Sequence, residues 1–162
     1  MARLFTFSLS NSSPYFNNTA PSSTVFSLAG GTQTNRYATN KNGSNYVAYC
    51  FAEVAGYSKF SSYTGNGSSD GPFVYTGFKP KWIMIKDTTT GTSGYDWFIW
   101  DSARNTYNLV NNELIPNSSG AELTGYFDVD FLSNGFKKRG TDTQTNTSGN
   151  SYIYAAFADV PF

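Results

Sequence analysis

Apolar residues in this chain come in short runs separated by Gly, Asn and Ser, and this grouping most constrains its fold. No segment keeps a 3.6-residue apolar period over ten positions, so helices longer than a turn or two are not expected. The 14 Phe and 12 Tyr favour pleated surfaces, whereas Gly, Asn and Ser favour turns. The sequence predicts an all-β fold, an antiparallel β-sandwich or jelly roll with two packed layers.

Three runs, 46–52, 82–85 and 152–158, are almost continuously apolar. A strand covered on both faces has this pattern, so each run is predicted to be a buried strand. Residues 103–114 carry the best helical pattern, but they are rich in Asn and are predicted to form an ordered loop.

Residues 127–131 have a different pattern from these continuous runs, because three apolar residues alternate with Asp128 and Asp130. This alternation predicts a strand that turns both carboxylates toward solvent. Asn134 and Gly135 follow shortly afterwards. Both residue types accept positive φ, so they predict a tight hairpin turn.

An internal repeat organises the chain. The sequence TNKNGSNY at 39–46 is echoed by TNTSGNSY at 145–152, an offset of 106, and the echo continues from FAEV at 51–54 to FADV at 157–160. Segment 73–83 has no counterpart in the first copy. The repeat predicts a truncated first unit, 1–60, and a complete second unit, 61–162, packed together as one β-rich body. The second unit or another subunit is expected to complete the truncated one.

Several classes of protein are excluded by composition. The chain has no His, which rules out Ser-His-Asp catalysis and His-ligated metals, and Cys50 alone forms neither an intramolecular disulfide nor a zinc site. Its 11 basic and 11 acidic residues balance, which argues against nucleic acid as a partner. No apolar stretch approaches the roughly 20 residues that span a bilayer, so no membrane insertion is expected. No signal peptide is recognised, so synthesis in the cytoplasm is expected.

Paired carboxylates are the remaining route to catalysis, because a glycosidase needs only two. Asp128 with Asp130, and Asp96 with Asp101, are the nearest pairs. A catalytic acid needs burial to raise its pKa, and the first pair is predicted to face solvent. No acidic spacing matches a calcium loop. We therefore predict no enzymatic activity, no cofactor and no metal, with a glycosidase as the least favoured alternative.

A carbohydrate platform is the most specific candidate site. Strand alternation over 95–101 places one Trp on each face, and an exposed ring with nearby polar groups is the usual arrangement for stacking a sugar. The competing interpretation is that both Trp side chains pack in the core. The candidate ligand-binding residues are Trp97, Trp100, Asp101, Arg104, Asn105 and Tyr107.

Five motifs carry a family resemblance: YVAYCFAEVAGYSKF at 46–60, YTGNG at 63–67, DGPFVYTGFKP at 70–80, FLSNGFK at 131–137 and AAFADVPF at 155–162. Together they resemble an uncharacterised aromatic-rich β repeat domain found near the C-termini of large phage structural proteins. Those proteins are mainly tail-fibre or tail-tip proteins of marine and cyanobacterial phages. The resemblance covers roughly residues 20–162 and transfers no catalytic residue.

The resemblance implies a virion location. We expect a phage structural protein, located in a tail fibre, at a fibre tip or on the capsid surface as a decoration protein. Its expected partners are other virion proteins and, as a further possibility, host-surface glycans. Few charges and many Tyr are also typical of interfaces, so a homo-oligomer is expected, with a trimer favoured. The alternative function is a stand-alone carbohydrate-binding, lectin-like module.

Overall fold

The computed structural model describes residues 19, 22, 24–28, 40–90 and 95–159. The chain divides into two compact units, Met1–Glu53 and Val54–Phe162. Each unit is described by itself. The predicted division into a truncated and a complete repeat stays a prediction.

All eight strands of the described residues lie in the second unit, and those residues contain no helix, which confirms the all-β prediction. The strands are antiparallel and form one sheet in the order β1-β8-β3-β4-β5-β6-β7-β2. The strands are β1 (Ser58–Thr64), β2 (Phe73–Tyr75), β3 (Trp82–Asp87), β4 (Trp97–Asp101), β5 (Val110–Leu114), β6 (Leu123–Leu132), β7 (Gly135–Lys138) and β8 (Ser151–Phe157).

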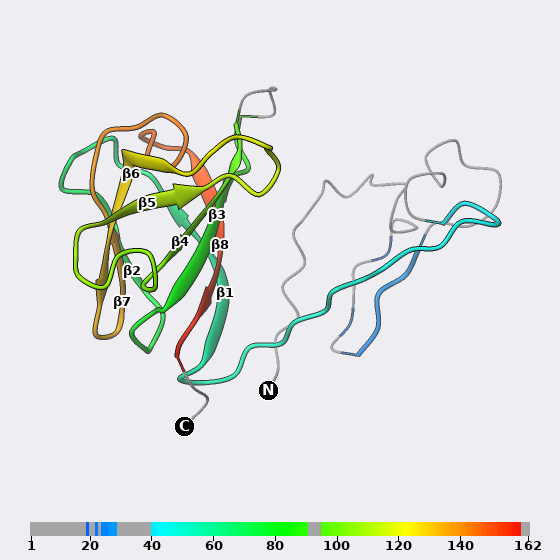
Figure 1. Cartoon of the computed structure of the whole chain (residues 1–162). Helices are drawn as coiled ribbons and strands as arrows, with labels where there is room; N and C mark the ends of the chain where they lie inside the picture. The colour runs from blue at the N-terminus through cyan, green and yellow to red at the C-terminus, as the bar shows by residue number, and fades with distance from the viewer. Residues whose placement is uncertain (1–18, 20–21, 23, 29–39, 91–94, 160–162) are drawn as a thin grey trace. The chain divides into compact units, whose positions relative to one another are not determined.

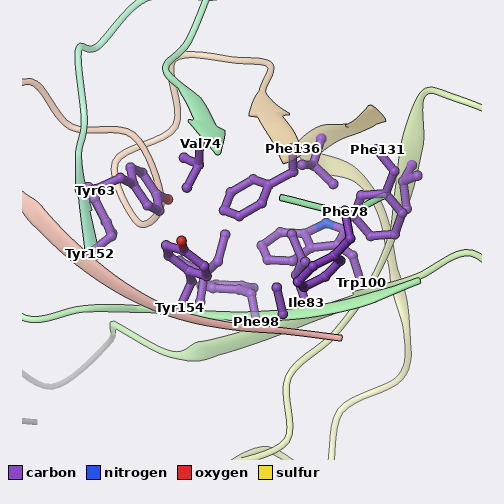
Figure 2. Close-up of a cluster of buried hydrophobic side chains, with 14 residues drawn as sticks. Tyr63, Val74, Phe78, Ile83, Phe98, Trp100, Phe131, Phe136, Tyr152 and Tyr154 are labelled. Atoms are coloured by element: carbon purple, nitrogen blue, oxygen red, sulfur yellow. The ribbon is translucent and has the colours of Figure 1, made fainter. Parts of the chain in front are cut away.

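The sheet curls until it is nearly barrel-shaped, and the two packed layers of the predicted sandwich are not confirmed (Figure 1). Rings from both ends of the strand order meet inside it. Tyr63 on the edge strand β1 stacks on Tyr152 at 5.0 Å between ring centroids and contacts Phe136 on β7 edge-on at 6.0 Å. Figure 2 shows these rings with Trp100 and others turned toward one interior. A single curved sheet therefore encloses its own core, and each buried aromatic contributes about 1.5–3 kcal/mol.

The predicted strands at 82–85 and 152–158 are confirmed as β3 and β8. β8 lies between β1 and β3 and turns Tyr152, Tyr154 and Ala156 into the core. The alternation predicted for β4 also holds, because Phe98 and Trp100 are fully buried while Trp97 is only partly so.

The prediction of a buried strand at 46–52 is wrong for the structure described here. Residues 40–53 contain no strand, and Val47 and Tyr49 are 78% and 82% exposed. An apolar run becomes a buried strand only where other strands pair with it. The corresponding run in β8 is buried because it pairs with β1 and β3. The prediction of a loop over 103–114 is wrong at its end, where Val110–Leu114 pairs with β4 and β6 as β5.

The predicted hairpin is present, but its turn lies one residue earlier. Leu132 pairs with Gly135, so Ser133 and Asn134 form the turn and Gly135 begins β7. A Cβ on Gly135 would lie 2.2 Å from the carbonyl oxygen of Val74. Glycine is therefore required by the close approach of β2, and not by a positive φ.

Candidate functional site

A groove lies where β3 begins and β4 ends, with a volume of about 420 Å³. Its walls come from the approach to β3, from the loop after β4 and from the chain that follows β8. Among the residues that line it are Lys79, Lys81, Ser102, Asn105, Tyr107 and Asp159. Small-molecule sites in proteins occupy roughly 300–1,000 Å³, so a mono- or disaccharide is of suitable size.

Asp101 starts the loop that forms one wall. Its Oδ1 accepts hydrogen bonds from the backbone N–H groups of Ala103 (3.0 Å) and Arg104 (2.9 Å), which turns the chain sharply at the end of β4. The guanidinium group of Arg104 contacts the Asp101 carboxylate and donates to Glu122 Oε2 at 2.6 Å. The charged groups of Asp101 and Arg104 thus hold the loop in its conformation.

Two amides fasten the same loop to the sheet. Asn105 Oδ1 accepts from the backbone N–H groups of Asn111 (3.1 Å) and Asn112 (2.8 Å). Asn108 donates to the carbonyl oxygen of Phe131 at 3.0 Å and accepts from its N–H at 2.9 Å. These bonds hold the loop while the intervening Tyr107 remains 85% exposed.

The side chains that line the groove present two ammonium groups, a phenol and an aliphatic hydroxyl group to a ligand. Lys79 is exposed, and Lys81 pairs with Asp159 at 3.2 Å. Ser102 Oγ is buried and has no hydrogen-bond partner among the described residues. Such an orphaned hydroxyl gains most from a ligand that supplies its missing partner. The arrangement suits a polar ligand rich in hydroxyl groups.

The six predicted ligand residues lie in four different settings. Asn105 and Tyr107 line the groove, and Asp101 with Arg104 supports the loop that carries them. Trp100 is fully buried in the core and cannot stack on a ligand, which corrects its assignment to the site. Trp97 lies at the opposite end of β4, about 13 Å along the strand from Asp101.

Sequence analysis missed Lys79, Lys81 and Ser102. The motif Lys79-Pro80-Lys81 was visible in the sequence, but nothing local indicates that it meets the loop after β4. That contact depends on the β3–β4 pairing, in which Trp82 lies opposite Asp101. The backbone N–H of Ser102 also donates to the carbonyl oxygen of Lys81 at 2.9 Å.

A second polar group, the interior ionic cluster, surrounds Lys138 inside the barrel. Lys138 is fully buried, and its Nζ donates to the carbonyl oxygens of Phe127 (3.1 Å) and Asp128 (3.0 Å). The same nitrogen lies 3.9 Å from Asp142 Oδ2 and 4.9 Å from the centroid of the Trp100 ring. Carboxylates, carbonyl groups and an aromatic face thus all surround one buried cation.

Burial perturbs the pKa values of this cluster. Desolvation lowers the pKa of Lys138 to about 8, against the opposing effects of Asp142, Asp128 and Glu113. Desolvation likewise raises the pKa values of Glu113 and Asp128, against the favourable charge of Lys138. Glu113 Oε2 and Asp128 Oδ1 are buried without a hydrogen-bond partner in the described part of the chain.

The prediction that Asp128 and Asp130 face solvent is therefore wrong. One oxygen of Asp128 is buried, and Asp130 accepts a hydrogen bond from Arg139 Nε at 2.7 Å. Raised carboxyl pKa values are typical of catalytic acids. Neither Glu113 nor Asp128 lines the groove, however, and both interact with Lys138, so the cluster is assigned a role in stability.

Within residues 40–90 and 95–159, together with the few described earlier, no three acidic, Cys or His side chains come together as a metal-binding group. No helix of the described residues has the length and apolarity needed to cross a membrane.

Comparison with known proteins gives one match. The family described as Domain of unknown function (DUF7483) matches residues 5–161. No curated protein and no solved structure matches the chain. The match extends over both compact units, and the chain therefore belongs to the DUF7483 family.

Proposed function

We propose that this chain is a structural protein of a phage virion, located at a tail fibre, fibre tip or capsid surface, that binds host-surface glycans and assembles with other virion subunits. The virion location rests on the motif resemblance. The binding role rests on the groove, which brings the exposed Tyr107 ring, two lysines and the orphaned Ser102 hydroxyl into one volume of about 420 Å³.

The chemistry of the groove favours a glycan over other ligands. A sugar presents an apolar ring face to an aromatic side chain and hydroxyl groups to polar ones. Tyr107 offers the ring, and Ser102 Oγ and the lysines offer hydrogen bonds. Because Asn105 and Asn108 fasten the loop, the groove is largely formed before the ligand arrives, which lowers the entropic cost of binding.

A glycan array followed by titration of the best binder tests this role. Tyr107→Ala should weaken binding about two- to tenfold, because a lost aromatic contact costs about 0.5–1.5 kcal/mol. Ser102→Ala should weaken binding less and leave the melting temperature unchanged. Tyr126→Ala is the matched control, since Tyr126 is 68% exposed and does not line the groove. Equal binding by the Tyr107 and Tyr126 variants would rule out this groove as the glycan site.

A stand-alone lectin-like module is the alternative that the same groove supports. A soluble monomer that binds glycans and does not associate with purified particles would favour it. We propose no catalysis for either role, since the carboxylates with raised pKa values lie away from the groove. Release of sugar from a bound glycan, abolished by Glu113→Gln, would contradict that.

A further inference from the structure

The groove where β3 begins and β4 ends carries an excess of positive charge. The charged side chains that line it are Lys79, Lys81 and Asp159. Lys81 pairs with Asp159 at 3.2 Å, whereas Lys79 forms no ion pair with any described residue. The carboxylate of Asp101, at the end of β4, already accepts from Arg104 and from two backbone N–H groups. Within the described part of the chain, one cation of the groove is therefore left to a ligand.

A fixed stretch of backbone carries the two lysines. Pro80, which is buried, separates them. The backbone N–H of Lys81 donates to the carbonyl oxygen of Phe157 at 2.8 Å, and its carbonyl oxygen accepts from Ser102 N–H at 2.9 Å. A proline fixes its own φ and disfavours helical backbone in the residue before it. Both ammonium groups are thus presented at the groove by a backbone that has little freedom to lose on binding.

Apolar side chains also line the groove. Val110 and Phe131 contribute to its walls and are almost completely buried. Low-dielectric walls strengthen the field of a charge in a cleft, so an anion beside Lys79 gains more there than on an open surface. The exposed Tyr107 ring and the buried Ser102 hydroxyl are left for the uncharged part of the same ligand.

We propose that the groove selects an anionic sugar, whose carboxylate or sulfate ester pairs with Lys79 while Tyr107 contacts the sugar ring. A hydrogen bond from an ammonium group to such an anion is charge-assisted and about twice as strong as a neutral one. A polyanion fits less well, because the 11 basic and 11 acidic residues of the chain balance. The inference rests on the proposed glycan-binding role and adds the chemical class of the glycan.

Paired probes separate recognition of the charge from recognition of the sugar. Digalacturonic acid, sialyllactose and sulfated lactose are the anionic probes, and digalactose and lactose are their neutral counterparts. In calorimetric titration of the full chain, at least one anionic probe should bind about tenfold more tightly than its counterpart. The ratio should fall when salt is raised from about 0.05 M to about 1 M, because the Debye length shrinks to about 3 Å. The carboxylated or sulfated probe with the larger ratio identifies the anion.

Variants locate the contact. Lys79→Gln should abolish the preference for the anionic probe and keep the affinity for the neutral one, because only the anion loses a partner. Asp159→Asn should act in the opposite direction. It removes the carboxylate of the groove and frees Lys81, so the anionic probe should bind about threefold more tightly. Lys137→Gln is the control, since it changes the net charge equally and Lys137 does not line the groove.

The possible failures are distinguishable. Equal binding of anionic and neutral probes, or a best binder on the glycan array without an anionic group, would overturn this inference and leave the glycan-binding role intact. An equal loss of anion binding in Lys79→Gln and Lys137→Gln would reveal a general charge effect and would also overturn it. Binding to no probe and to no glycan of the array would overturn the glycan-binding role and this inference together.

Discussion

Lys138 carries a charged side chain but lies in a fully buried environment. A buried ammonium is tolerated because two carbonyl oxygens, the Trp100 ring and the carboxylates of the interior ionic cluster surround it. Removing one member of such a group leaves charges of one sign buried, at a cost of about 3–5 kcal/mol. The cluster therefore stabilises the fold only as a complete set.

Lys138→Met should destabilise the protein by about 3–5 kcal/mol at pH 7, because Glu113, Asp128 and Asp142 then lack their cation. The deficit should shrink as the pH falls toward 5. The pKa values of Glu113 and Asp128 are raised in the folded state, so the folded protein takes up protons before the unfolded chain does, and the repulsion is relieved. Urea unfolding at both pH values measures the difference.

Lys137→Met is the control for this prediction. Lys137 pairs at 2.6 Å with Asp70, which is mostly exposed, and solvent screening leaves pairs of this kind with little effect on stability. The change in the free energy of unfolding caused by Lys137→Met should be small, and it should not shrink at acid pH as the change caused by Lys138→Met does. A Lys138 variant as stable as the wild type at pH 7 would show that the cluster is neutral when folded.

The β6–β7 hairpin decides where β2 can lie. Gly135 pairs with Tyr75, and a Cβ there would collide with the Val74 carbonyl and the Phe73 ring. Gly135→Ala should destabilise the fold by about 1–3 kcal/mol, as overpacking does, and lower the exchange protection of the β2 amides first. Hydrogen exchange detects this. Gly120→Ala, where the added Cβ meets only the Ser118 hydroxyl at 3.2 Å, should leave protection unchanged.

At the scale of the whole molecule, the described residues comprise the curled sheet of the second unit and residues 40–53, which contain no strand. Lys41 lies in the exposed turn at 41–44, whereas Lys59, Lys86 and Lys138 lie in strands. Among the described residues, limited trypsin treatment should therefore cut after Lys41 earlier than after these strand lysines. Mass spectrometry would identify the fragment that begins at Asn42, and circular dichroism would report its β content. An early cut after Lys59 or Lys86 would contradict the pairing of β1 and β3 in the sheet.

The sequence by itself determined the all-β class, β3, β8 and the two faces of β4, since alternation and continuous apolar runs are local properties with a period of two. It also identified Asn105 and Tyr107 of the candidate groove. Lys79 and Ser102 of the same groove could not be identified from the sequence, because only strand pairing brings them together.

The tertiary structure decided the rest. Tyr46 and Tyr152 begin corresponding segments of the internal repeat, yet only the second is a strand, since β1 and β3 pair with it on both sides. The burial of Lys138 and of Trp100 likewise follows from the curling of one sheet around its own core. Closure brings together residues far apart in the chain, and no local pattern specifies which partners they meet.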